Sequence, residues 1–263
     1  MKILRFEYNY RLEFDSDIDH QQFQLRCIPR NGSHQRVLEI DYTIEPVDEV
    51  TRLKDGFGNP IYVGSALAPH NHFAFHVKGL VECNNNPISK ESECYPVYKY
   101  PTSLTQPNQA IKDFANRFDK LEGSEKAIAL MHELYNEMTY IPGSTNIYTT
   151  ASQAFALKSG VCQDYAHIYI SMMRYLGYPA RYIAGMMLGE GATHAWCEVY
   201  VDNHWLKLDP TNNCLVYETY IKLAHGRDYK DCVIDKGMFN GNCMQRQYVS
   251  VVVSEEKFIS DEE

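Results

Sequence analysis

The chain of 263 residues is long enough for one large domain or two smaller ones, and 44% of its residues are hydrophobic, as in ordinary globular proteins. Its formal net charge of −9, without a long run of lysines and arginines, argues against a nucleic-acid partner, because binding phosphates requires a basic surface. No stretch reaches the roughly 20 apolar residues of a membrane helix, so no membrane partner is expected.

The sequence also bears on the compartment in which the protein works. The first residues are charged and alternate in polarity, unlike a secretory signal. The eight cysteines are scattered without a CxxC pair, which favours free thiols over a disulfide framework. We therefore expect a cytoplasmic protein.

Residues 1–103 carry the pattern of short β-strands. Residues 4–14 alternate between apolar and polar side chains, as in a half-buried strand. Further strand-like runs, separated by turns rich in Gly, Asn and Pro, are 23–28, 37–44, 61–63 and 73–81. We predict an N-terminal antiparallel β-sandwich domain over 1–103.

Helical spacing replaces this pattern in the second half of the chain. Apolar residues predict helices over 108–121 and 124–138, and Thr150 with Gln153 forms a capping box that begins a third. After a fourth helix, the strand-like segments are 181–188, 194–201, 205–208 and 247–253. We predict an α+β core over 104–263, with helices packed on an antiparallel sheet and an acidic C-terminal tail over 254–263.

Cys162 stands where the fourth helix is expected to begin. Gly160 is expected to end the third helix, and an apolar face through Ala166, Ile170 and Met173 indicates a helix that starts at or just before Cys162. The positive end of the helix dipole favours the thiolate, which is the nucleophilic form, and the free N–H groups there suit an oxyanion. Taken alone, this placement still favours a buried structural cysteine.

Two further residues change that interpretation. His194 begins a strand-like segment, and Asp209 ends the next one. If the two segments pair as a hairpin around residues 202–204, the imidazole and the carboxylate lie near the same end of the hairpin. The carboxylate then binds one imidazole nitrogen and leaves the other for the thiol of Cys162. The sequence therefore predicts a nucleophile, a base and an orienting group.

Several motifs in this order resemble those of the bacterial transglutaminase-like cysteine hydrolases. They are Ser159–His167 with Gly177–Tyr182, His194–Trp196, Asp209–Asn212 and Gly226–Tyr229. The resemblance covers about residues 124–253, and residues 1–103 more loosely resemble the N-terminal β domain of the family. It implies a papain-like core in which Cys162 is the nucleophile, His194 the base and Asp209 the orienting residue. No cofactor and no metal is expected.

The second oxyanion donor is left open by the sequence. Papain-like enzymes often carry a Gln shortly before the nucleophile, but position 156 is Ala and Gln153 lies too far upstream. The backbone N–H of Cys162 is the first candidate donor. Candidates for a second donor or for the substrate cleft are Tyr140, Gln163 and Trp196.

Other polar residues near the motifs are expected to be structural. His167 lies five positions after Cys162, which turns it well away from the nucleophile on a helix. Asp164 is expected to stabilise the helix start, and Arg227 to be a buried ion-pair partner. His70, His72 and His76 could share a strand face, but no Cys or carboxylate at ligand spacing accompanies them, which argues against zinc.

The predicted function is hydrolysis of an amide or peptide bond by thiol acyl transfer, on a peptide or protein substrate. Transfer of the acyl group to an amine, as in a true transglutaminase, uses the same site and stays open. A binding scaffold with a vestigial triad also stays open, although the three intact residues argue against it.

Overall fold

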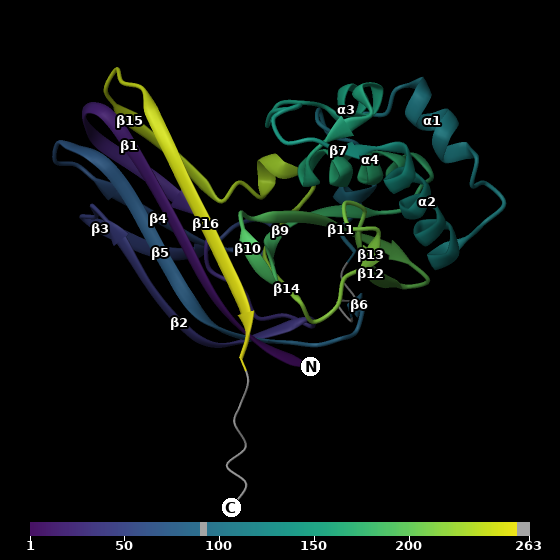
Figure 1. Cartoon of the computed structure of the whole chain (residues 1–263), viewed down its shortest axis with the longest axis horizontal. Coiled ribbons are helices and arrows are strands. Elements are labelled where there is room, and N and C mark those ends of the chain that lie inside the picture. Colours follow the sequence, from purple (N-terminus) through teal and green to yellow (C-terminus); the bar gives the residue numbers. More distant parts are fainter. Residues whose placement is uncertain (90–93, 257–263) are drawn as a thin grey trace, which may run out of the picture.

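One long strand, β1 (Lys2–Leu25), organises the N-terminal part of the computed structural model, which describes residues 1–89 and 94–256. Its inward residues are buried and its alternating outward residues are exposed, as the polarity pattern predicted. β1 pairs antiparallel with β5 (His70–Cys83) and β16 (Gln245–Glu255) along its first half, and with β4 (Pro60–Ala66) along its second. The sheet therefore folds over into the two layers of a sandwich (Figure 1).

The other strands of this antiparallel sheet come from three parts of the chain. They are β2 (Gln35–Glu45), β3 (Glu49–Lys54), β10 (Gly189–Gly191) and β15 (Asp235–Asn240). Phe23, Phe75 and Val251, from three different strands, pack in one apolar cluster between the layers. The predicted N-terminal antiparallel fold is confirmed.

The core consists of helices on one face of a second antiparallel sheet (Figure 1). Its helices are α1 (Gln109–Asn116), α2 (Gly123–Glu137), α3 (Ala151–Leu157) and α4 (Cys162–Tyr175), with 3-10 turns η1 (Pro96–Lys99) and η2 (Tyr229–Asp231). The sheet order is β13 (Cys214–Leu215), β12 (His204–Asp209), β11 (His194–Val201), β9 (Ala180–Met187) and β14 (Tyr220–Gly226), with β6 (Ile88–Ser89) pairing with β12. A short parallel pair joins β7 (Thr139–Tyr140) to β8 (Ser159–Gly160). α4 is buried because it contacts the other three helices as well as β9 and β11.

The start of α3 agrees with the boundary predicted from the sequence, whereas the end of α1 differs from it. Thr150 and Gln153 form the predicted capping box. α1 stops at Asn116 instead of 121, because the chain tightens into hydrogen bonds between residues three apart over 114–121. No helix of the described residues is both long and apolar enough to cross a membrane.

The end of the chain returns to the N-terminal sheet. β15 and β16 pair with β1 rather than with the core sheet, although both lie within the predicted core range 104–263. β16 continues to Glu255, so the segment predicted as a tail over 254–263 starts within a strand; residues 257–263 lie outside the described residues. The division at residue 103 stays a prediction, and the two parts are joined by strand pairing across it.

Gly185 on β9 lies opposite His194 of β11, beneath the Trp196 ring. A Cβ added there would lie 2.2 Å from the Ile221 carbonyl oxygen and 2.3 Å from the Trp196 ring. We expect Gly185→Ala to destabilise the protein by about 1–3 kcal/mol. The added methyl group would clash with a backbone oxygen, which cannot move away as easily as the end of a side chain can. Urea unfolding measures the effect.

The matched control is Gly56→Ala, because a Cβ at Gly56 would meet no atom within 4 Å. We expect it to stay within about 0.5 kcal/mol of the wild type. Equal stability of the two variants would contradict the close packing beneath Trp196.

Candidate active site

Cys162 is the first residue of α4, as predicted. The preceding segment is fixed by the β7–β8 pair, and α3 has already ended at Leu157 rather than at Gly160. The carboxylate of Asp164 accepts from the backbone N–H of Val161 at 2.8 Å, which closes the first turn. Gly160 is needed here because a Cβ would lie 2.6 Å from that of Asp164. Local packing therefore fixes the position of the Cys162 backbone.

His194 and Asp209 come together through the β11–β12 hairpin. Its two-residue turn, Asp202-Asn203, has positive φ angles of 49° and 63°, which match the right-handed twist of a tight hairpin. The register pairs Cys197 with Leu208, so Asp209 is a diagonal neighbour of His194. The distance from His194 Nε2 to Asp209 Oδ2 is 2.7 Å. The predicted hairpin is present, with a turn one residue shorter than expected.

The imidazole of His194 lies between Asp209 and Cys162. Because Nε2 donates to the Asp209 carboxylate, Nδ1 is the nitrogen left to interact with the Cys162 side chain. Burial lowers the pKa of His194, but the hydrogen bonds to Asp209 and Cys162 outweigh it and raise that pKa to about 10. An imidazolium beside the sulfur stabilises a thiolate, so the arrangement suits nucleophilic chemistry.

The Asp209 carboxylate is fully buried and accepts hydrogen bonds on both oxygens. Oδ1 accepts from the backbone N–H groups of Thr211 and Asn212 at 2.9 and 3.2 Å. Oδ2 accepts from the side chains of His194, Asn212 and Tyr220 at 2.7, 2.7 and 2.8 Å. Burial raises the pKa of Asp209, but the three side-chain bonds hold it below its usual value. The carboxylate therefore stays ionised and holds the imidazole in place.

Tyr220, the first residue of β14, was not predicted from the sequence. Besides donating to Asp209, its ring lies 6.1 Å from the His194 ring and 5.3 Å from the Trp196 ring. Trp196 is only 1% exposed and stacks on His194 at 6.3 Å. Trp196, predicted as a cleft candidate, thus supports the imidazole from within the core.

The other two cleft candidates point in different directions. Tyr140 is 51% exposed, and burial and the nearby Cys162 both raise its pKa. It lines a cavity of about 650 Å³ together with His194 and Asn212. Gln163 is almost buried, and its amide points to the Ile147 carbonyl at 3.5 Å. Tyr140 therefore remains a candidate oxyanion donor, whereas Gln163 holds the loop that precedes α3.

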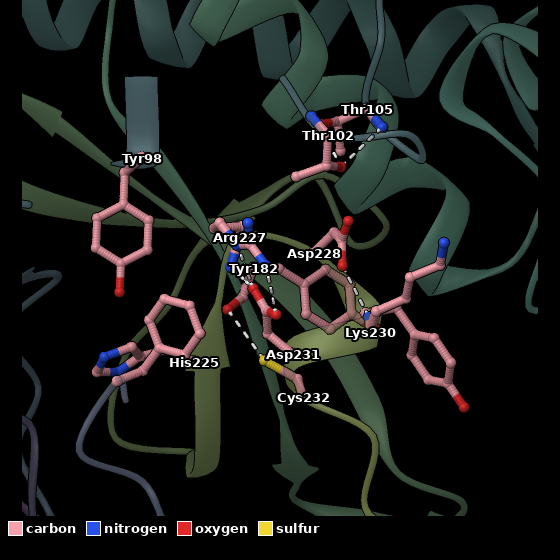
Figure 2. A network of polar contacts seen from close by, with 12 residues as sticks. Tyr98, Thr102, Thr105, Tyr182, His225, Arg227, Asp228, Lys230, Asp231 and Cys232 are labelled. Carbon is pink, nitrogen blue, oxygen red and sulfur yellow. Dashed lines mark hydrogen bonds and ion pairs between the residues drawn. The ribbon is translucent and has the colours of Figure 1, made fainter. Parts of the chain in front are cut away.

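The residues expected to be structural are anchored away from the sulfur. His167 is buried, its Nε2 accepts from the Tyr229 N–H at 3.1 Å, and burial lowers its pKa to about 3. Figure 2 shows Arg227 turned toward Asp231, with Nε 2.8 Å from the carboxylate. Arg227 is thus an ion-pair partner as predicted, but its side chain is 42% exposed rather than buried.

The three histidines of β5 have separate contacts. His70 contacts Gln21 at 2.8 Å, His76 contacts Glu7 at 3.1 Å, and His72 contacts its neighbour Asn71 at 3.3 Å. Within residues 1–89 and 94–256, no group of three or more His, Cys, Asp or Glu side chains is arranged to hold a metal ion.

Comparison with known proteins identifies the family. A sequence model of the transglutaminase-like superfamily matches residues 112–210, and one of the bacterial transglutaminase-like N-terminal region matches residues 4–82. The chain belongs to the bacterial transglutaminase-like superfamily. The first match contains Cys162, His194 and Asp209, and the second covers most of the N-terminal sheet.

Relatives match over nearly their whole length. A protein of Mycobacterium leprae, named only as uncharacterized, is 27% identical over 241 residues, which cover 83% of this chain and 86% of that protein. One from Mycobacterium tuberculosis, named likewise, is 28% identical, with 90% of this chain and 88% of that protein covered. The crystal structure of a "Putative Cysteine Protease" from Cytophaga hutchinsonii has a TM-score of 0.77 at 23% identity, covering 98% of this chain and 93% of that one. This likeness confirms the predicted α+β fold of the superfamily.

The raised pKa of His194 predicts how the reactivity of Cys162 depends on pH. An ordinary thiol of pKa about 8.5 is alkylated slowly at pH 6, whereas a thiolate paired with an imidazolium remains reactive. Because His194 stays protonated up to about pH 10, we expect the advantage over a His194→Ala variant to be large at pH 6 and to vanish above pH 10. Iodoacetamide labelling of the Cys162 peptide, followed by mass spectrometry, measures both rates. Equal rates at pH 6 would contradict the ion pair.

Removing the Tyr220 hydroxyl should weaken the hold of Asp209 on the imidazole. Tyr220→Phe leaves one fewer donor on a buried carboxylate, so the pKa of Asp209 should rise. Since a hydrogen bond to a charged group contributes about 1.5–3 kcal/mol, we expect Cys162 alkylation at pH 6 to slow by about tenfold. The exposed Tyr217→Phe is the control and should leave the rate unchanged.

Proposed function

We propose that the protein is a cysteine-dependent hydrolase of amide or peptide bonds. Cys162 is the nucleophile, His194 the general base and acid, and Asp209 the group that orients the imidazole. The single observation that carries this proposal is the imidazole of His194, which is hydrogen-bonded to the buried Asp209 and whose pKa is raised by Asp209 and by its interaction with Cys162. A thiol, a base and a buried orienting carboxylate in this order are the elements of nucleophilic acyl transfer.

The reaction proceeds through an acyl-enzyme. The Cys162 thiolate attacks the amide carbonyl, and negative charge develops on the carbonyl oxygen. The N–H of Cys162 is a donor for that oxyanion, since backbone N–H groups in the first turn of a helix have no partner within it. The exposed hydroxyl of Tyr140, on the cavity wall, is the proposed second donor. The imidazolium of His194 protonates the leaving amine, and water then releases the acyl group with His194 as base.

Two further observations support this assignment. The fold neighbour from Cytophaga hutchinsonii carries a name that agrees with a thiol protease. All eight cysteines are free thiols, which suits the reducing cytoplasm, and we include that location in the proposal. Peptide or protein chains are the proposed substrates.

Acyl transfer to an amine is the competing reaction, because the same acyl-enzyme can be intercepted by an amine instead of water. A glutamine-containing peptide offered with a dye-labelled primary amine distinguishes the two. We expect ammonia or peptide release to exceed amine incorporation. Faster incorporation than hydrolysis would assign the protein to the transglutaminases proper.

Replacing the nucleophile tests both reactions at once. We expect Cys162→Ala to lose turnover by at least about 10³-fold while its urea midpoint changes little, because the side chain is only half-buried. The half-buried Cys243→Ala, which lies outside the site, should keep full activity. Retained turnover in Cys162→Ala would move the chemistry to another residue. Inactivity of the wild type toward every peptide would favour a binding scaffold.

A further inference from the structure

A groove lies between the core and the N-terminal sheet. Two cavities of about 410 and 870 Å³ adjoin one another, since both are lined by Tyr10, Tyr148, Asp235, Lys236 and Gln247. One wall comes from β1, β15 and β16 of the sheet, and the other includes the loop before α3 and η2 of the core. The N-terminal sheet therefore contributes a surface that could bind a ligand.

The near end of this groove is tied to the proposed active site. Thr193, the residue before His194, lines the smaller cavity, as does Ile147. The Ile147 carbonyl contacts the amide of Gln163, the residue after Cys162. The groove therefore begins at residues that precede His194 or contact the neighbour of Cys162, so a chain whose scissile amide lay at the sulfur would extend toward the N-terminal sheet.

The lining of the groove fits an extended polypeptide. Its farther part carries the amide side chains of Gln22 and Gln245, which can donate to and accept from peptide groups. Tyr148 and Met238 are largely exposed at its edge, where they offer apolar area to a ligand. Such a mixture of apolar and amide groups is typical of peptide-binding surfaces.

Asp235 is the one carboxylate that lines both cavities. Among the described residues, its side chain accepts a hydrogen bond only from the Tyr10 hydroxyl, and burial raises its pKa. The neighbouring lysines are turned to other groups: Lys236 donates to the Lys230 carbonyl at 2.9 Å, and Lys230 donates to Ser103 at 3.1 Å. Among residues 1–89 and 94–256 no ion pair to Asp235 is formed, and a desolvated carboxylate without an ion pair costs free energy, which a cationic ligand would offset.

η2 holds this part of the groove in place. Figure 2 shows Asp228 bonded to the Lys230 backbone and Asp231 paired with Arg227, which together fix the turn. The Tyr229 N–H donates to the buried His167 of α4, the helix that begins at Cys162. The segment that leads to Asp235 on β15 is thus hydrogen-bonded, through η2, to the helix that begins at Cys162.

We propose that Asp235 determines specificity by binding the cationic side chain of a lysine or arginine in an extended peptide substrate, a few residues from the scissile amide. This inference rests on the proposed function and names its substrate class. Tyr10 is the positioning residue, since its ring stacks on Phe75 at 4.6 Å and its hydroxyl fixes the carboxylate.

The test uses binding to the full chain carrying Cys162→Ala, so that its outcome does not depend on turnover. N-acetylated octapeptides of alanine and glutamine carry one lysine at each position in turn, with norleucine in the matched set, and a C-terminal dye reports binding by fluorescence anisotropy. We expect at least one lysine peptide to bind about tenfold more tightly than its norleucine counterpart, with arginine equivalent to lysine. An unblocked norleucine peptide separates recognition of a side chain from recognition of a terminal amine.

Asp235→Asn, added to Cys162→Ala, should reduce the lysine preference to less than about twofold while binding of the norleucine peptide is retained. Asp119→Asn, an exposed carboxylate on the core surface, is the control and should keep the preference. Equal affinity for lysine and norleucine, a preference that survives Asp235→Asn, or no binding of any peptide would each overturn the inference. Failure of the proposed hydrolysis is recognised separately, by wild-type protein that binds the same peptides without cleaving them.

Discussion

The hydrogen bonds to the Asp209 carboxylate are the interaction on which the proposed site depends. Burying an ionised carboxylate costs several kcal/mol unless donors replace the lost water. Here two donors are backbone N–H groups of the turn that follows Asp209, and two are the Asn212 and Tyr220 side chains. The remaining donor is His194, so the imidazole is bound by a group that is itself fixed. The His194 imidazole is therefore oriented by the same hydrogen bonds that stabilise the buried charge of Asp209.

The same face of the sheet carries a second buried carboxylate with a different environment. Glu198 lies two positions after Trp196 on β11 and pairs with Arg181 and Lys222 at 2.6 and 3.0 Å. These cations lower the pKa of Glu198 and compensate its charge within the sheet, despite the burial that opposes ionisation. β11 therefore carries two polar groups with opposite partners. The His194 imidazole is bound by a carboxylate, whereas the Glu198 carboxylate, on the far side of Trp196 along the strand, is bound by cations.

The sequence predicted the features whose signals are local. The β11–β12 hairpin follows from polarity alternation and an Asp-Asn turn, and the start of α4 follows from the spacing of its apolar face. β14 was missed because Lys222 and His225, although buried, interrupt its apolar residues and leave neither an alternation nor an apolar run. Its Ile221 packs against the N-terminal cluster and its Ala224 against the core helices. Tyr220, which donates to Asp209, could therefore not be recognised before the strand was placed.

The pairing of strands that are distant in the sequence could not be predicted from local sequence patterns either. The alternation of 247–253 indicated a strand, but nothing in those residues names β1, more than 200 positions earlier, as the partner. The helical spacing of 108–121 likewise gave the apolar face of α1 but not the tightening of the chain after Asn116. Burial of one face fixes periodicity, whereas partners and ends depend on packing between distant segments.

The run Cys162-Gln163-Asp164 illustrates how closely the proposed nucleophile and the nearby walls are coupled. Asp164 accepts from Thr145 at 2.6 Å, and Gln163 contacts the Ile147 carbonyl, so both residues after the sulfur hold the loop that precedes α3. That loop lines the groove toward the N-terminal sheet, while Tyr140, just before it, lines a separate cavity together with His194. Any shift of α4 that moves the sulfur therefore also moves the surfaces against which a substrate would lie. In acyl transfer, where small misplacements of the reacting atoms cost large factors in rate, such coupling preserves their relative positions.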